Sequence, residues 1–240
     1  MSRPTAWRLS LPLRTGDMSL FYWTTMIFLR WLLRRVFRCQ VRGLENIPAG
    51  GALIVGNHVS VLDPEFICAA ARGHDLSWLA KKPLFEIPVI GLCLRWLRTI
   101  PLNQDGADIT AFREALARME RGNLVGIFPE GGIPRPGEHR VPSPGVAVLG
   151  HMAQKPVVPV GVSGLRPLYR WKGWLPVPSV VWIRFGQPLD PPSGPRLNKE
   201  SRQRFADRCM LAITELVRAN EEEEAALLAT RDRQIPASRV

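Results

Sequence analysis

The 240-residue sequence lacks the short motifs of several large enzyme classes. It contains no GxSxG, no HExxH, no Walker phosphate loop and no GxGxxG. The usual signatures of serine hydrolases, zinc proteases, P-loop proteins and dinucleotide-binding enzymes are therefore absent. Cysteine is scarce, with 4 residues, and none forms a CxxC pair or a spacing with histidine that predicts zinc. We expect no metal ion, and free, buried thiols of the kind found in a reducing compartment.

The sequence also lacks an apolar run long enough to cross a bilayer. Residues 18–29 are uncharged and rich in aromatic and aliphatic side chains. Arg30 ends this run before it reaches the roughly 17 apolar residues that a spanning helix needs. A signal peptide is not predicted either, because the arginines follow the apolar run and no small-residue cleavage site is visible. Residues 1–38 are predicted to form a basic, amphipathic helical segment.

Positive charge is concentrated at the N-terminus of a chain whose formal net charge is +11. Residues 1–42 hold eight arginines and one acid, Asp17, whereas the rest of the chain is nearly balanced. Such a distribution indicates nucleic acid or an anionic membrane surface as a partner. Arg30, Arg34 and Arg38 fall on one helical stripe among large apolar residues, which favours the membrane interface. The alternative is a helix that docks its apolar stripe on the protein core and leaves its basic face in solvent.

Strand-like apolar runs alternate with helical patterns over residues 39–230, and residues 231–240 are expected to form a flexible tail. This alternation predicts an α/β fold, with a mixed, mostly parallel sheet flanked by helices and preceded by the N-terminal, membrane-interfacial helix. The acidic run at 221–224 is interpreted as a solvated face. The predicted strands are 51–56, 76–80, 98–102, 123–128, 157–163 and 179–186. The predicted helices are 64–72, 87–96, 107–121, 143–153 and 199–229.

Polar residues follow the first of these strands directly. Asn57, His58 and Asp63 lie in the turn that leads to the next helix. A histidine suits general-base work because its ordinary pKa is about 6.5, and a carboxylate on its other ring nitrogen fixes the tautomer. An alternative role for Asp63, which precedes a proline, is to cap the following helix. We predict that His58 and Asp63 form a catalytic pair.

A glycine-rich loop follows the predicted strand at 123–128. It contains Glu130, Gly131 and Gly132, and then Arg135. Glycines let backbone N–H groups approach an anion or an oxyanion, and arginine adds charge-assisted hydrogen bonds to phosphate. An ordinary turn is the alternative. Because ligands of open α/β sheets bind beyond the carboxyl ends of the strands, this loop is expected at the same edge as His58.

Taken together, these motifs resemble the 1-acyl-sn-glycerol-3-phosphate acyltransferase-like family of glycerolipid and lysophospholipid acyltransferases. The NHxxxxD block of that family is matched by Asn57, His58 and Asp63, and its FPEG block by residues 128–131. Its short Pro-Val-rich strand is matched by residues 157–160. The resemblance implies transfer of a fatty acyl chain from acyl-CoA or acyl-carrier protein to the free hydroxyl of a lysophospholipid such as 1-acylglycerol-3-phosphate. No cofactor is implied beyond the acyl donor.

The family pattern is incomplete at two positions. Arginines expected in the second block, after a strand, and within the third block are replaced by Gln104 and Ile133. The resemblance associates both positions with the phosphate of the acceptor, so the acceptor headgroup stays open, and Arg135, Arg98 and Lys82 are the candidates to compensate. The predicted substrate-binding residues are Asn57, Glu130, Gly131, Gly132, Arg135 and Lys82.

The resemblance places the protein at the cytoplasmic face of a membrane, peripheral or monotopic through its N-terminal helix. Its expected partners are the phospholipid surface, the lysophospholipid and the acyl donor, with no nucleic acid. One alternative is a catalytically altered, membrane-associated scaffold or an anionic-surface binding protein of the same fold, suggested by the two replaced arginines. A hydrolase that releases fatty acid is a further alternative. The intact NHxxxxD and FPEG blocks favour the enzyme that transfers an acyl chain.

Overall fold

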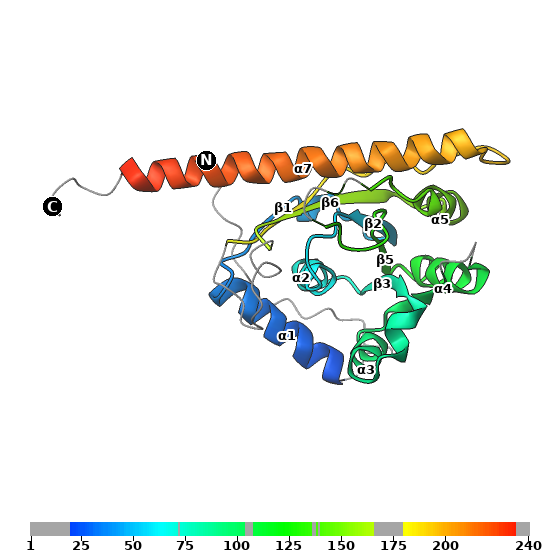
Figure 1. Cartoon of the computed structure of the whole chain (residues 1–240), viewed down its shortest axis with the longest axis horizontal. Coiled ribbons are helices and arrows are strands. Elements are labelled where there is room, and N and C mark those ends of the chain that lie inside the picture. Colours follow the sequence, from blue (N-terminus) through cyan, green and yellow to red (C-terminus); the bar gives the residue numbers. More distant parts are fainter. Residues whose placement is uncertain are drawn as a thin grey trace.

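The centre of the molecule is a seven-stranded sheet with the strand order β1-β7-β6-β2-β5-β3-β4 (Figure 1). The computed structural model describes residues 20–71, 73–103, 108–135, 138, 140–165 and 180–233. The strands are β1 (Gln40–Arg42), β2 (Ala52–Gly56), β3 (Leu76–Lys81), β4 (Ile100–Leu102), β5 (Leu124–Ile127), β6 (Val157–Ser163) and β7 (Trp182–Phe185). Neighbouring strands are parallel except for β6 and β7, which are antiparallel. The prediction of a mixed, mostly parallel sheet is confirmed.

Helices cover both faces of this sheet (Figure 1). They are α1 (Leu20–Arg35), α2 (Asp63–Ala70), α3 (Pro88–Trp96), α4 (Ile109–Glu120), α5 (Gly145–Ala153) and α7 (Lys199–Arg233), with short 3-10 helices η1 (Leu44–Asn46) and η2 (Lys82–Glu86). One apolar layer contains buried residues of α1 and α2, and the other contains those of α4, α5 and α7. The sheet is therefore the middle layer of a three-layer sandwich.

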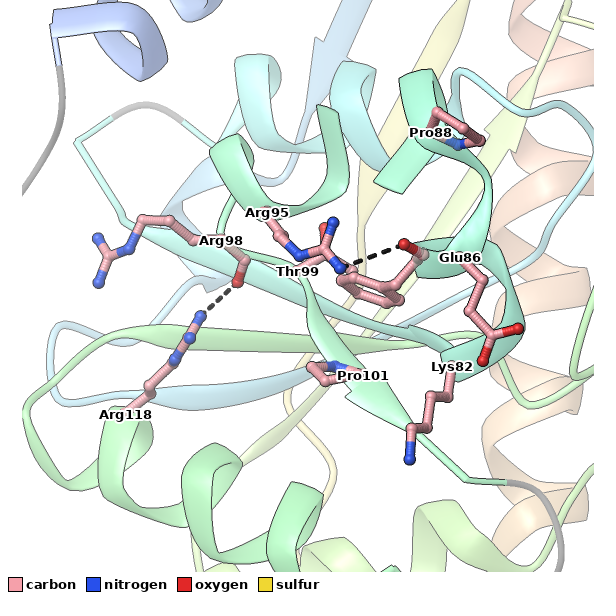
Figure 2. Close-up of a pocket in the computed structure, with 9 residues that line it drawn as sticks. Lys82, Glu86, Pro88, Arg95, Arg98, Thr99, Pro101 and Arg118 are labelled. Carbon is pink, nitrogen blue, oxygen red and sulfur yellow. Dashed lines mark hydrogen bonds between the residues drawn. The ribbon is translucent and has the colours of Figure 1, made fainter. Parts of the chain in front are cut away.

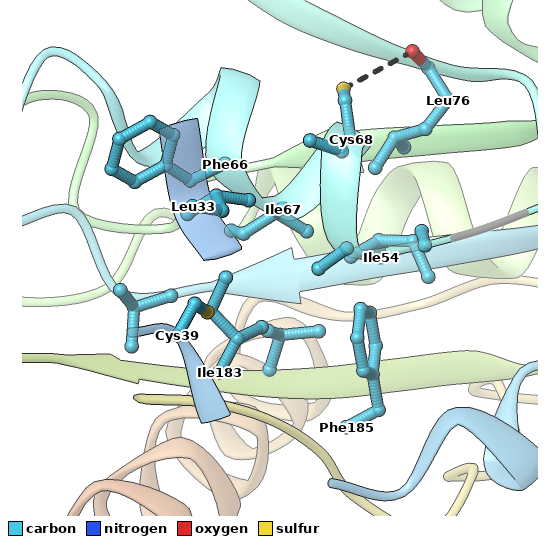
Figure 3. Packing of buried hydrophobic residues seen from close by; sticks show 14 of the residues in the cluster. Leu33, Cys39, Ile54, Phe66, Ile67, Cys68, Leu76, Ile183 and Phe185 are labelled. Carbon is cyan, nitrogen blue, oxygen red and sulfur yellow. Dashed lines mark hydrogen bonds between the residues drawn. The ribbon is translucent and has the colours of Figure 1, made fainter. Parts of the chain in front are cut away.

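Strand β2 shows why this sequence forms a central parallel strand. All of its residues are buried, as expected for an uninterrupted apolar run with helices on both faces. Leu53 and Val55 belong to the layer of α4, α5 and α7, whereas Ile54 belongs to the layer of α1 and α2. Figure 3 shows Ile54 beside Ile67 of α2. Because β2 is fixed between β5 and β6, the residues that follow it start from a rigid position.

The predicted elements are observed with shifts of a few residues at their ends, and one strand was not predicted. Strand β1 has three residues and none of them is fully buried, so it is too short to produce an alternating pattern. Helix α7 continues to Arg233, past the predicted end at 229 and into the segment expected to be a flexible tail. Residues 234–240 lie outside the described residues.

The apolar stripe of α1 faces the protein core. Met26, Leu29 and Leu33 are between 0% and 8% exposed, and they pack in the same layer as Phe66 and Ile67 of α2. This packing is the alternative that the sequence left open for the N-terminal segment. The apolar residues of the stripe therefore pack α1 against the rest of the protein.

The outer face of α1 keeps large apolar side chains in solvent. Ile27, Phe28 and Trp31 are 45–56% exposed, and Phe28 and Trp31 stack with ring centroids 6.1 Å apart. No helix among the described residues is long and apolar enough to cross a membrane. Membrane association of residues 1–38 stays a prediction, and among the described residues it rests on this outer face. Residues 1–19 lie outside the described part of the chain.

The acidic run of α7 is not simply a solvated face. The carboxylate of Glu223 accepts hydrogen bonds from Arg42 at 2.6 Å and from Arg184 at 2.5 Å. Arg184 also donates to the side chain of Asn220 at 2.9 Å. Burial raises the pKa of Glu223, but the hydrogen bonds from the two arginines outweigh it and lower the pKa. Glu223 therefore fixes the long helix to the two strands, β1 and β7, at one side of the sheet.

Candidate active site

His58 and Asp63 lie together beyond the carboxyl end of β2. The ring nitrogen Nδ1 of His58 is 3.0 Å from Oδ2 of Asp63. The side chain of Asp63 is fully buried and that of His58 is 16% exposed. Since the carboxylate accepts, Nδ1 carries the proton and Nε2 keeps its lone pair. Nε2 has no hydrogen-bond partner among the described residues, so it is available as a base.

Asp63 also fixes the turn that carries His58. The backbone N–H groups of Val59 and Ser60 donate to the same Oδ2 atom at 2.6 and 2.7 Å. Burial raises the pKa of Asp63, against the hydrogen bonds from His58, Ser60 and Val59, which lower it. Asp63 begins α2 without capping it, since Leu62 is the N-cap residue and no side-chain cap bond is formed. The alternative role of Asp63 as a cap is therefore not observed.

Two aromatic rings fix the plane of the imidazole. His58 stacks on Phe128 and Phe128 on Trp78, with centroid separations of 4.2 Å in both pairs. The indole N–H of Trp78 donates to the carbonyl of Pro64 at 3.0 Å, which ties the stack to the first turn of α2. A Cβ atom at Gly126 would lie 2.4 Å from the Trp78 ring, so glycine is required there. Sequence reasoning did not assign Trp78 or Gly126 to the site.

Asn57 positions the turn. Its side-chain Nδ2 donates to the carbonyl of Val162 at 2.9 Å, and its Oδ1 accepts from the backbone N–H of Val162 at 2.8 Å. Asn57 is 8% exposed. Both polar atoms of the side chain are thus engaged with β6, which gives Asn57 a positioning role, and substrate binding by Asn57 stays a prediction.

The glycine-rich loop lies beside His58, as predicted, and Glu130 joins the two. Oε2 of Glu130 accepts the backbone N–H of His58 at 3.0 Å. Burial raises the pKa of Glu130, whereas this hydrogen bond lowers it. The N–H of Gly131 donates to the carbonyl of Phe128 at 3.1 Å. The backbone donors of Gly131, His58, Val59 and Ser60 are thus engaged, and the N–H of Gly132 has no partner among the described residues.

Two cations lie beside Gly132. A Cβ atom at this glycine would lie 3.2 Å from Nη1 of Arg140 and 3.7 Å from Nζ of Lys81. Lys81 is the last residue of β3 and Arg140 forms an ion pair with Glu138 at 2.9 Å. Lys81 was not among the predicted site residues, although its place directly after a predicted strand pointed to this edge of the sheet.

The cations that were predicted lie elsewhere. Lys82 is in η2 and lines a groove beside β4, and Arg135 is exposed, with its backbone N–H bound to Glu138 at 2.7 Å. Arg98 forms an ion pair with Asp75 at 2.6 Å. Gln104 lies outside the described residues. Substrate binding by Arg135 and Lys82 stays a prediction, and the cations that the structure shows beside Gly132 are Lys81 and Arg140.

The site offers a base without a neighbouring nucleophile. Cys68 is buried, and burial raises the pKa of its thiol well above the ordinary value. Ser60 is also buried and its hydroxyl accepts the N–H of Leu62 at 3.2 Å. Within the described part of the chain, no group of three or more His, Cys, Asp or Glu residues is placed to hold a metal ion. This arrangement favours proton removal from a bound hydroxyl over a covalent enzyme intermediate.

Glu65 in the first turn of α2 is expected to make stability depend on pH. Burial raises its pKa from 4.5 to about 7. The native state therefore keeps a proton that the unfolded chain has released, and the free energy of unfolding falls as pH rises from about 4.5 through 7, by at most about 3 kcal/mol. Glu65→Gln is expected to remove this dependence and to stabilise the protein above pH 7. Urea unfolding between pH 5 and 8 measures it, with Glu86→Gln on the exposed surface as the control. An unchanged pH profile in Glu65→Gln would contradict the assignment.

The amino-acid sequence matches a protein family and several individual proteins. A sequence model of the Acyltransferase family matches residues 38–163, just over half of the chain. A 1-acyl-sn-glycerol-3-phosphate acyltransferase of Pseudomonas aeruginosa is 29% identical over 185 residues, which cover 74% of this chain and 70% of that protein. An uncharacterized protein of Mycobacterium tuberculosis is 30% identical over 203 residues. The chain spans 28% to 54% of the length of the mycobacterial relatives it matches.

The fold is also found in a solved structure. The crystal structure of PlsC, the 1-acyl-sn-glycerophosphate acyltransferase of Thermotoga maritima, matches with a TM-score of 0.62. The match covers 85% of this chain and 81% of that chain, at 23% sequence identity. At this identity the match establishes the shared fold.

Proposed function

This chain belongs to the Acyltransferase family, and we propose that it transfers a fatty acyl chain from acyl-CoA or acyl-carrier protein to the free hydroxyl of a lysophospholipid. The observation that carries the proposal is the hydrogen bond between Nδ1 of His58 and the buried carboxylate of Asp63. This contact leaves Nε2 as the base in a site that is partly open to solvent. The reaction needs no cofactor other than the acyl donor.

The proposed reaction is one direct transfer. Nε2 of His58 takes the proton of the acceptor hydroxyl, and the resulting oxygen nucleophile attacks the thioester carbonyl. The carbon–sulfur bond then breaks, and the imidazolium returns its proton to the leaving thiolate. The products are an ester and a free thiol. Asp63 stabilises the imidazolium that forms between these two proton transfers.

The backbone N–H of Gly132 is the proposed donor to the oxyanion. The donors of Val59, Ser60 and Gly131 already bind protein oxygens. One such donor to an oxyanion contributes about 3–4 kcal/mol to stabilising a transition state. The side chains of Lys81 and Arg140 lie nearby and offer N–H donors that suit an anionic acceptor as well.

Lys81 and Arg140 are proposed to bind the phosphate of the acceptor. Lys81→Met is expected to raise the KM for a lysophospholipid about 10- to 100-fold, because a charge-assisted hydrogen bond contributes about 1.5–3 kcal/mol. The kcat is expected to change much less, since the ammonium does not take part in proton transfer. Steady-state kinetics with a short-chain, soluble acceptor measures both constants. Lys155→Met, outside the site, is the control, and an unchanged KM in Lys81→Met would rule out this phosphate contact.

The proposed place of action is a phospholipid surface at the cytoplasmic face of a membrane. A lysophospholipid and its product both reside there, and the outer face of α1 carries exposed Phe28 and Trp31 together with exposed Arg34 and Arg35. Aromatic and basic side chains on one helix suit the membrane interface. Nucleic acid is not a proposed partner.

A direct assay separates the proposed function from its alternatives. The purified full chain is incubated with labelled acyl-CoA or acyl-carrier protein and a panel of lysophospholipids, and the products are identified by mass. Formation of a diacyl phospholipid, dependent on the lysophospholipid, is the expected result. Release of free fatty acid without an acceptor would identify a hydrolase. Absence of turnover with every donor and acceptor, in a folded protein, would support the scaffold.

A further inference from the structure

Helix α3 is apolar on nearly all sides and lies at the surface. Among its residues only Gly91 is buried. Val89 is 73% exposed, Ile90 and Leu92 are 45% exposed and Trp96 is 42% exposed. A helix that is apolar all round is normally covered, either by a protein core or by lipid. We define the α3 surface by its exposed large apolar residues, which are Leu84, Ile87, Val89, Ile90, Leu92 and Trp96.

The α3 surface is held in a fixed position by η2. A Cβ atom at Gly91 would lie 2.1 Å from the carbonyl oxygen of Phe85, so α3 approaches η2 through its glycine. Arg95 donates to the same carbonyl at 3.2 Å, and its guanidinium lies 6.0 Å from the centre of the Phe85 ring. Phe85 itself is buried. The contacts with η2 therefore fix the orientation of α3. The side that carries Gly91 packs on η2, and the bulky side chains point away from it.

Positive charge borders the α3 surface. Figure 2 shows a groove beside α3 and β4 that is lined by Lys82, Arg95, Arg98 and Arg118, with Glu86 as its acidic residue. The volume of the groove is about 860 Å³.

Two of these four cations are free of carboxylates. Arg98 and Arg118 form ion pairs with Asp75 and Glu114, at 2.6 and 2.8 Å. Lys82 and Arg95 form no ion pair with any other described residue. The apolar surface is thus edged by two cations that are available to an anionic partner.

We propose that the α3 surface inserts into the headgroup region of an anionic phospholipid leaflet, with Lys82 and Arg95 at the level of the lipid phosphates. A nine-residue helix is about 13 Å long, too short to span a bilayer of about 30 Å but long enough to lie in its interface. Basic residues near the surface strengthen such binding to anionic lipids. A second copy of this chain is the weaker candidate, because pairing two such surfaces would bring like charges together.

This contact would place the catalytic site close to lipid. Helix η2 begins directly after Lys81, the last residue of β3, and Lys81 lies beside Gly132 in the candidate active site. Figure 1 shows α3 and α1 at the bottom of the molecule and α7 along the top. The α3 surface and the outer face of α1 would thus meet the same leaflet, and α7 would face away from it.

Cys93 provides a native probe of this proposal. It is the exposed cysteine on α3, whereas Cys39, Cys68 and Cys209 are buried. The full chain is labelled at Cys93 with an environment-sensitive fluorophore and mixed with phosphatidylcholine vesicles that contain or lack phosphatidylglycerol. We expect a blue shift and a several-fold rise in emission with the anionic vesicles, and quenching when the lipids carry bromine on their acyl chains. The control carries Cys93→Ser and Leu211→Cys, which moves the label to an exposed position of α7, and is expected to show neither effect.

A pair of variants tests the same surface without a label. Val89→Asp with Leu92→Asp is expected to reduce flotation with anionic vesicles about tenfold, because two charges must then enter the apolar part of the interface. Leu211→Asp with Leu227→Asp on α7 is the matched control and is expected to float like the wild type. Circular dichroism and thermal unfolding establish that both variants are folded.

Three results would overturn the proposal. These are unchanged emission of the Cys93 label with anionic vesicles, normal flotation of the α3 variant, and a protein-concentration-dependent change in emission without vesicles, which would identify a second copy as the partner. The proposal stands on surface residues and not on acyl transfer. The vesicle assays contain no acyl donor, so they report binding alone. If the protein bound vesicles through α3 but transferred no acyl chain, only the proposed function would be contradicted.

Discussion

Replacing His58 by alanine is expected to reduce the rate of acyl transfer by about 10²- to 10⁴-fold, because a positioned general base contributes that much and no other base is bonded to Asp63. The fold is expected to survive. The ring of His58 is lost from the outer end of the stack with Phe128, and such a contact contributes about 0.5–1.5 kcal/mol. Initial rates of product formation by purified wild type and variant measure the effect.

His151 offers a matched control for this substitution. It is also part-buried, and its Nδ1 atom makes one hydrogen bond, of 3.0 Å, to the carbonyl of Pro192. His151→Ala is therefore expected to retain full activity, since it removes a similar ring from α5 and leaves the His58–Asp63 pair intact. Equal rates for wild type and His58→Ala would eliminate the proposed mechanism.

Asp63→Asn is expected to reduce acyl transfer by about 10³- to 10⁴-fold with little loss of structure, since removing the carboxylate from such a catalytic unit typically costs on the order of 10⁴-fold. The asparagine oxygen can still accept the N–H groups of Val59 and Ser60. Since Nδ1 of His58 contacts the same Oδ2 position, this oxygen also keeps the hydrogen bond to the imidazole, and the amide group takes the place of Oδ1, which has no hydrogen-bond partner among the described residues. The tautomer is thus kept, and what is lost is the negative charge that stabilises the imidazolium. The kcat is expected to fall while the KM values change little.

Two further variants separate this electronic effect from loss of the turn. Asp63→Ala leaves the N–H groups of Val59 and Ser60 unpaired, and it is expected to lower the free energy of unfolding by about 2–5 kcal/mol as well as the activity. Asp108→Asn is the control, because Asp108 accepts the backbone N–H groups of Asn103 and Ala111 without contacting a histidine. An Asp63→Asn variant with wild-type kcat would show that the carboxylate only supports the backbone.

The contact between His58 and Asp63 was predictable because its geometry is local. His58 and Asp63 are five residues apart, at the end of an apolar strand whose position follows from its pattern. The role of Asn57 was not predictable, because its partner Val162 is 105 residues away and depends on β6 lying next to β2. The same limit applies to Lys81 and Arg140, which meet at Gly132 only after β3 and the glycine-rich loop are in place.

Helical periodicity indicates which face of a helix is apolar, but not what covers that face. The stripe of α1 was read as a membrane face, yet Met26, Leu29 and Leu33 pack in the core. Helix α3 was predicted only as a helix of the sandwich, yet its large apolar residues are exposed. Helix α3 contacts η2 on the side that carries Gly91, and no pattern in a single sequence reveals that contact.

The two hydrogen bonds between Asn57 and Val162 determine when the His58 turn can form during synthesis of the chain. Strand β2 is hydrogen-bonded to β6 and β5, both of which follow it by about 70 residues or more in the chain. The turn that carries His58 therefore cannot be complete on the ribosome until the polypeptide has emerged beyond residue 163, the end of β6. Helix α1 leaves the ribosome long before that point. A nascent chain would thus present its N-terminal helix to its surroundings while it is still catalytically silent, and activity would begin only once most of the sheet has been synthesised.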